Sequence, residues 1–163
     1  MLKKRIGKAA PARSPSPEVV DIGGLKRILG FSLRRAQLSM YKDYGRFMDR
    51  LDLRPAQYSV LLLVRENPGL SQSTISQILG IQRANFVSLL DELESRGWVE
   101  RRSSEKDRRS FALHLTKKGH AFMKQANVAH SELEASLTQR LGEQDTRSLL
   151  RLLNQFADEA SVE

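Results

Sequence analysis

The sequence predicts a mainly α-helical chain that carries one small β-hairpin. Apolar residues recur at helical spacing along most of the chain after residue 25, whereas the period changes from 3.6 to 2 around residues 98–115. Glycine or proline stands at the ends of the helical stretches, where such residues stop or start helices. The 163 residues include no cysteine, which excludes disulfides and thiolate zinc sites.

The first segment is predicted to be a disordered basic arm over residues 1–20. Its first 17 residues contain three prolines and almost no large apolar side chains. Residues 1–13 contain five Lys or Arg residues and no acidic residue, so they hold more than half of the net charge of +8. Because an unstructured tail can carry such charge without binding anything, the net charge alone is weak evidence for a nucleic-acid partner. Phosphate contacts by the arm remain the alternative.

Three helices are expected next. Apolar spacing over residues 25–51 predicts one long amphipathic helix, with a break near Gly30 as the alternative. Pro55 suits the first turn of a second, largely buried helix that stops at residues 67–69, Asn-Pro-Gly. Ser71 is a natural N-cap for a third helix, which should direct Ile75, Ile78 and Leu79 toward the core and end at Gly80.

A fourth helix over residues 82–96 precedes the hairpin. Its apolar residues form one stripe, ended by Gly97, and leave six others pointing outward: Arg83, Ala84, Asn85, Val87, Ser88 and Glu92. Residues 98–102 and 110–115 alternate like strands, with a charged loop between them. Thr116 should cap a fifth helix, and residues 141–142 separate it from a sixth. Arginine and lysine are dense around the loop, at Arg96, Arg101, Arg102, Lys106, Arg108 and Arg109.

A helix, a tight glycine turn, a second helix and a charged hairpin follow each other in the order of a winged helix-turn-helix, whose second helix fits the major groove of DNA. The sequence resembles the MarR family of bacterial regulators in three motifs at suitable spacing. These are Leu93-Glu94-Ser95-Arg96-Gly97-Trp98-Val99-Glu100-Arg101, then Asp107-Arg108-Arg109-Ser110, then Leu115-Thr116-Lys117-Lys118-Gly119. The resemblance covers about residues 25–158.

The resemblance implies a DNA-binding homodimer that reads a pseudo-palindromic operator, in repression more often than in activation. It implies three parts: a dimerisation helix over residues 21–53, a DNA-binding domain over residues 54–116 and C-terminal dimerisation helices over residues 117–163. It implies phosphate contacts by Ser71, Gln72 and Ser73, and major-groove contacts by Gln82, Arg83, Ala84, Asn85 and Ser88. In the wing it implies minor-groove contact by Arg109 beside Arg108, with Asp107 holding the loop in shape.

Such regulators usually release DNA when a small molecule binds. Residues 29–38 resemble relatives that sense aromatic acids or their CoA thioesters, including hydroxycinnamoyl-CoA. Arginine favours carboxylate and phosphate, and aromatic rings favour a flat apolar body. We therefore hypothesise an anionic aromatic or aromatic acyl-CoA effector held by Phe31, Arg34, Arg35, Tyr41, Tyr44, Phe47, Met48 and Tyr58. The alternative is that these rings only pack the dimer core.

Other functions have less support. No phosphate loop, nucleophile elbow or Ser/His/Asp set is apparent, so we expect no enzyme and no cofactor. The three histidines lack metal-ligand spacing, so we expect no metal. No apolar run is long enough for a membrane span or a signal peptide, which favours a cytoplasmic protein without a membrane partner. A sequence-tolerant architectural DNA-binding protein and a ligand-binding module without a DNA role are the alternative functions.

Overall fold

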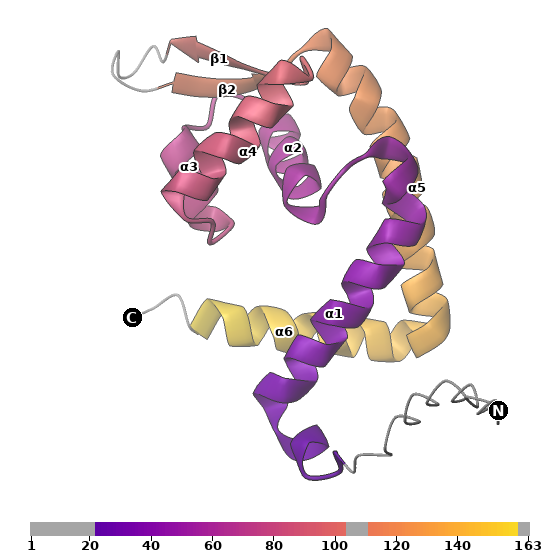
Figure 1. The fold of residues 1–163 in the computed structure, drawn as a ribbon. Helices are drawn as coiled ribbons and strands as arrows, with labels where there is room; N and C mark the ends of the chain where they lie inside the picture. The colour runs from indigo at the N-terminus through magenta and orange to yellow at the C-terminus, as the bar shows by residue number, and fades with distance from the viewer. Residues whose placement is uncertain (1–21, 104–110, 160–163) are drawn as a thin grey trace, which may run out of the picture. The chain divides into compact units, whose positions relative to one another are not determined.

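The computed structural model describes residues 22–103 and 111–159. The predicted N-terminal arm lies outside the described residues, as do the wing-tip residues Asp107, Arg108 and Arg109. The chain divides into two units, one ending at Gln37 and the other beginning at Leu38. Each unit is described by itself. Figure 1 labels the helices and strands.

The predicted first helix is shorter than expected. A 3-10 turn, Leu25–Arg27, ends at Ile28, whose backbone is extended, and α1 then runs over Leu29–Met48. The break therefore lies at Ile28, and Gly30 is inside the helix. At the other end, Asp49–Leu51 form a second 3-10 turn that closes at Asp52 with a left-handed φ of 46°. The predicted helix included both 3-10 turns because apolar residues recur in a 3-10 helix at nearly the same spacing as in an α-helix.

The three helices of the central segment match their sequence signals closely. They are α2 (Pro55–Glu66), α3 (Gln72–Ile78) and α4 (Arg83–Ser95). Ser71 caps α3, since its Oγ accepts a hydrogen bond from the backbone N–H of Thr74 at 3.1 Å. Gly80 and Gly97 follow α3 and α4 with φ values of 61° and 69°, which favour glycine. Ile78 was expected to face the core and is instead 58% exposed.

A two-stranded antiparallel hairpin follows, made of β1 (Val99–Ser103) and β2 (Phe111–Leu115). Val99 lies opposite Leu115, and Ser103 lies opposite Phe111. The loop before α3 runs along the other edge of β2. The N–H of Gly69 donates to the carbonyl of Leu113 at 2.9 Å, and the N–H of Leu113 donates to the carbonyl of Leu70 at 3.0 Å. These bonds tie the hairpin to the start of α3.

Two long helices complete the chain, α5 (Lys117–Leu141) and α6 (Glu143–Glu159). Thr116 caps α5 as predicted, because its Oγ1 accepts from the N–H of Gly119 at 3.0 Å. The same Oγ1 donates to the carbonyl of Gly97 at 2.6 Å, which joins the start of α5 to the end of α4. None of the described helices combines the length and the apolar character needed to cross a membrane.

One core lies beneath α4. It contains side chains from α1, α2, α3, α4, the hairpin and α5, and its largest fully buried apolar members are Phe86, Met48, Leu61, Ile75, Leu90, Leu93, Leu113 and Met123. At the base of the hairpin, the Trp98 ring stacks on Phe122 of α5 at a centroid distance of 3.7 Å. Because α4 buries one stripe in this core, its opposite side is left uncovered beside α3 and the hairpin (Figure 1).

Candidate nucleic-acid interface

The uncovered side of α4 carries the residues that the periodicity placed outward. Phe86, Leu90 and Leu93 are buried, and the burial of this stripe fixes the rotation of the helix about its axis. Five predicted groove-facing residues are consequently exposed, namely Gln82, Arg83, Ala84, Asn85 and Ser88. Ala84 and Ser88 are small and lie one turn apart, so an incoming surface can approach the helix backbone closely between them.

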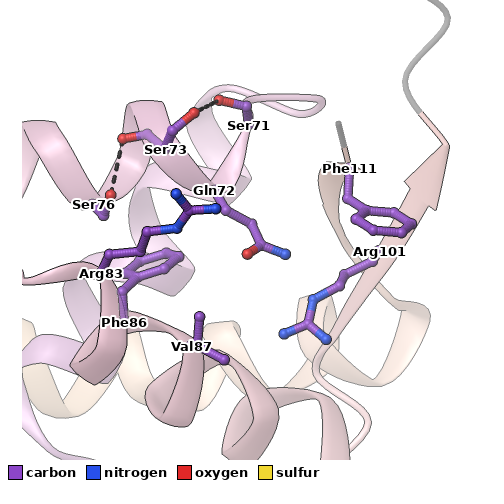
Figure 2. Close-up of a pocket in the computed structure, with 9 residues that line it drawn as sticks. All are labelled: Ser71, Gln72, Ser73, Ser76, Arg83, Phe86, Val87, Arg101 and Phe111. Carbon is purple, nitrogen blue, oxygen red and sulfur yellow. Dashed lines mark hydrogen bonds between the residues drawn. The ribbon is translucent and has the colours of Figure 1, made fainter. Parts of the chain in front are cut away.

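The start of α3 presents a chain of hydroxyl groups. The Oγ of Ser71 lies 2.8 Å from the Oγ of Ser73 and 2.8 Å from the Oγ1 of Thr74. The Oγ of Ser76 donates to the carbonyl of Ser73 at 2.9 Å (Figure 2). Gln72 extends from the same turn toward α4 (Figure 2). The three residues predicted to contact phosphate, Ser71, Gln72 and Ser73, therefore form one polar surface.

A groove of about 590 Å³ separates α3 and α4 from the hairpin. Ser76 and the polar surface of α3 line one side of it, and Arg101 and Phe111 line the other. Arg83, Phe86 and Val87 of α4 complete the lining (Figure 2). The groove thus brings two arginine side chains, several hydroxyl groups and two exposed apolar side chains together at the uncovered side of α4.

Arg101 fastens the hairpin to α4. Its Nη2 lies 2.7 Å from Oδ1 of Asp91, and its Nη1 lies 2.8 Å from Oε2 of Glu94. Its backbone N–H also donates to Oε1 of Glu94 at 3.1 Å. Because two carboxylates face one guanidinium, the charge of Arg101 is neutralised within the protein, and its main effect is to hold β1 against the helix.

Two more arginines of the dense cluster are also paired internally. Arg96 forms an ion pair with Asp52, donates to the carbonyl of Asp52 at 2.7 Å and lies over the Trp98 ring. Arg102 donates from Nε to Oε1 of Glu100 at 3.0 Å. In the described part of the cluster, the arginine density that suggested nucleic acid is therefore partly a set of structural ion pairs. Lys106, Arg108 and Arg109 lie outside the described residues.

A polar network supports the other flank of α4. Gln57 of α2 is 1% exposed, and its Nε2 donates to Oε2 of Glu92 at 2.8 Å. The backbone N–H of Arg54 donates to Oε1 of Gln57 at 2.9 Å, while the guanidinium of Arg54 pairs with Glu92. Glu92 was expected to point outward. The structure instead places it over the start of α2, where it fixes the flank of α4 that carries Asn85.

The ion pairs of Arg101 with Asp91 and Glu94, and the contacts of Gln57, were not predicted from the sequence, in which Arg101 was named only as a member of the arginine-rich cluster and of a family motif. These contacts join different elements, and the pairing of distant segments is not encoded in local periodicity. Val87 and Phe111 line the groove as apolar residues that are 39% and 52% exposed. A signal for Val87 was available, because it was the one β-branched apolar residue on the outward face of the predicted helix.

The predicted effector residues fall in different surroundings. In the first unit, Arg34 and Arg35 are exposed, and the guanidinium carbon of Arg35 lies 5.9 Å from the centre of the Phe31 ring. In the second unit, Tyr44, Met48 and Tyr58 belong to the core, with Phe47 packed at its margin and Tyr41 half exposed. The structure therefore brings Tyr44, Met48 and Tyr58 together as packing residues.

The two buried tyrosines differ at their hydroxyl groups. The Tyr58 hydroxyl donates to Oδ1 of Asn127 at 3.2 Å, and the Tyr58 ring stacks on His130 at a centroid distance of 4.3 Å. The Tyr44 hydroxyl is buried and has no hydrogen-bond partner among the described residues. Burial raises the pKa of Tyr44, with a further contribution from nearby Tyr58. Burial likewise raises the pKa of Tyr58, against a lowering by Arg65.

Comparison with known proteins gives a consistent result. A model described as the MarR family matches residues 51–110. A putative transcriptional regulatory protein for the hcr operon of Thauera aromatica is 30% identical over 156 residues, which cover 95% of this chain and 92% of that protein. The solved structure of a transcriptional repressor, CouR, bound to a 23-mer DNA duplex has a TM-score of 0.79 and 42% identity, and the match covers 85% of this chain and 98% of CouR. A structure of CouR bound to p-coumaroyl-CoA has a TM-score of 0.76 and 40% identity, covering 85% and 97% of the two chains.

Proposed function

The chain belongs to the MarR family, and from this membership we propose that it is a ligand-responsive transcriptional repressor that binds a pseudo-palindromic operator as a homodimer. The observation that carries the proposal is the exposed polar side of α4 beside the groove formed with α3 and the hairpin. The repressor CouR, which is similar over nearly its whole length, has been solved on a DNA duplex. Because its proposed target is genomic DNA, the chain acts in the cytoplasm.

In the proposed complex, α4 enters the major groove. Arg83 suits guanine and Asn85 suits adenine, since each can form two hydrogen bonds with that base edge. Gln82, Ala84 and Ser88 complete the contact surface, while Ser71, Gln72 and Ser73 contact phosphate groups. From the family resemblance, Arg109 with Arg108 reaches the minor groove and Asp107 supports the loop. Residues 54–116 form the DNA-binding domain.

The dimer is proposed to form through residues 21–53 and 117–163. The strongest support is the apolar side of α6, which a single chain leaves open to solvent. Its exposed apolar residues are Leu149, Leu150, Leu152, Leu153 and Phe156. Monomeric proteins rarely expose apolar surface of this density on one helix. A second copy would bury it and would place two α4 helices on successive turns of the duplex, about 10 base pairs apart.

The proposed effector is an aromatic acid or an aromatic acyl-CoA. CouR has been solved with p-coumaroyl-CoA bound, and the exposed Arg34 and Arg35 of this chain suit carboxylate or phosphate groups. The effector shifts the protein away from DNA only by its differential affinity for the DNA-incompetent state. Thermal-shift and DNA-release assays with p-coumarate, p-coumaroyl-CoA and free CoA test this part. It is rejected if none of the three alters either measurement, or if Arg34→Ala/Arg35→Ala leaves a response unchanged.

Selection of bound sequences from a random duplex pool tests the DNA-binding proposal. A regulator should enrich one symmetric sequence and prefer it over random duplex by about 10³-fold or more at fixed salt. An architectural protein would bind all sequences with similar affinity. Failure to bind duplex DNA at all would instead favour an interaction module without a DNA role.

Two substitutions then test the site assignment. Asn85→Ala should relax the preference at one base position in each half-site, because it removes a base contact. Arg109→Ala should weaken operator binding by about 1–3 kcal/mol. Titrations of the selected operator and of its single-base variants measure both effects. If both variants bind like the wild type, the assigned surface is wrong.

A further inference from the structure

Val87 is an exposed apolar residue on the polar side of the proposed recognition helix. It lies on α4 one turn after Arg83 and is 39% exposed. Its neighbours on the outward side of the helix, Ala84 and Ser88, are small. Val87 lies at the flank of the core stripe formed by Phe86, Leu90 and Leu93, so part of its apolar surface stays exposed in a single chain.

The position of Val87 is well defined by what surrounds it. Val87 lines the groove between α4 and the hairpin together with Arg83, Gln72 and Arg101 (Figure 2). Arg101 is held by Asp91 and Glu94, so the wall opposite Val87 is fixed to the same helix. A β-branched side chain in a helix has essentially one rotamer, so its methyl groups point in one fixed direction. Val87 is therefore a rigid apolar contact at the edge of a polar surface.

The major groove offers one apolar feature to such a contact. Base edges there present hydrogen-bond donors and acceptors, and only thymine presents a methyl group. We propose that Val87 reads a thymine methyl group and makes thymine the preferred base at one position in each half-site. The inference rests on the proposed DNA-binding function and deepens it. Val87 is four positions after Arg83, a rise of about 6 Å along the helix, so the thymine lies within about two base pairs of the base that Arg83 contacts.

Deoxyuridine substitution tests the proposal, because it removes the methyl group and leaves every hydrogen-bonding group in place. Each thymine of the selected operator is replaced in turn, and the dissociation constant is measured at fixed salt. The wild type should lose about fourfold in affinity at one thymine per half-site, as expected for one methyl group returned to water. Val87→Ala should bind the natural operator at least about fourfold more weakly than the wild type does. Replacing the same thymine by deoxyuridine should then cause no further loss of affinity in this variant.

Two further variants make the result specific. Val87→Ile keeps a β-branched apolar side chain and should keep the deoxyuridine penalty at that position. Ile78→Ala removes another exposed apolar side chain of the same domain, one that does not line the groove, and should also keep the penalty. The inference is overturned if no thymine shows a penalty in the wild type, or if the penalty persists in Val87→Ala. If the wild type instead binds the selected operator and random duplex with equal affinity, the proposed function itself is rejected.

Discussion

At the residue scale, single atoms decide whether the base of the hairpin can form. Gly119 lies at the first turn of α5 directly against the backbone of Trp98, and a Cβ built on it would stand 2.0 Å from the carbonyl oxygen of Trp98. Glycine is needed here because no side chain fits, and not because of its backbone conformation, since the φ of Gly119 is not positive. The glycine of the family motif therefore allows α5 to pack against the strand that begins the wing.

Gly119→Ala should destabilise the protein by about 3 kcal/mol or more, because backbone atoms cannot move aside as a flexible side chain can. Thermal unfolding followed by circular dichroism measures the effect. Gly30→Ala is the matched control, since nothing lies within 4 Å of its added Cβ and alanine favours helix. A melting temperature of Gly119→Ala equal to that of the control would contradict this packing.

The buried tyrosines provide a second test at this scale. Tyr44→Phe should leave stability at pH 7 unchanged or slightly higher, because the hydroxyl that it removes has no partner among the described residues. Tyr58→Phe should cost about 1 kcal/mol, because it removes the hydrogen bond to Asn127. Denaturant unfolding of the two variants beside the wild type measures both values. A larger loss for Tyr44→Phe than for Tyr58→Phe would show that the Tyr44 hydroxyl has a partner.

The same residues predict how stability depends on pH. Since burial raises the pKa of Tyr44 and of Tyr58 in the folded chain, the folded state holds these protons more tightly than the unfolded state. Their contribution is fully present below the unfolded value of about 10 and is lost as the pH rises above it. Between pH 8 and pH 11, the free energy of unfolding should fall less for Tyr44→Phe than for the wild type. An equal loss would contradict the assignment to Tyr44.

At the scale of elements, the link between α4 and the hairpin determines whether both can act on one duplex. Arg101 provides that link through Asp91 and Glu94. Arg101→Met should weaken operator binding about tenfold, because the hairpin is no longer held at a fixed angle to α4. The slope of affinity against salt should not change, since the charge of Arg101 is already neutralised. A slope lower by about one unit would show that Arg101 contacts phosphate instead.

A control and a double variant complete this test. Arg65→Met removes an arginine of similar exposure that pairs with Glu66 on the same helix, and it should leave operator affinity unchanged. Arg101→Met combined with Glu94→Gln should be less destabilised than the sum of the single changes, with a coupling of about 1 kcal/mol. Additive effects would mean that the two side chains do not interact in solution.

The sequence predicted elements well where one residue determines a boundary. Ser71 and Thr116 cap helices, and Gly80 and Gly97 end them, through local geometry that the residue type alone specifies. The sequence did not predict burial and pairing where these depend on contacts with other elements. Ile78 has helical spacing, yet α3 is so short that only Ile75 is buried in the core. The partners of Glu92 come from α2, 35 or more residues away in sequence, so no local pattern could reveal them.

At the scale of the whole molecule, the proposed function needs two copies. One α4 covers only one half-site, and the exposed apolar side of α6 has no role in a single chain. Dimerisation would bury that side and fix the spacing of the two α4 helices, so that symmetry in the protein selects symmetry in the operator. An effector that changes this spacing would release DNA without touching the recognition surface.

The most direct test of this account is sedimentation of the purified chain alone and with the selected operator. We expect a dimer in the absence of DNA and one dimer per symmetric duplex, with at least about 10³-fold weaker binding to a random duplex of equal length. Leu150→Glu/Leu153→Glu should yield a folded monomer that loses this preference. A wild-type monomer, or equal affinity for symmetric and random duplexes at low salt, would contradict the account.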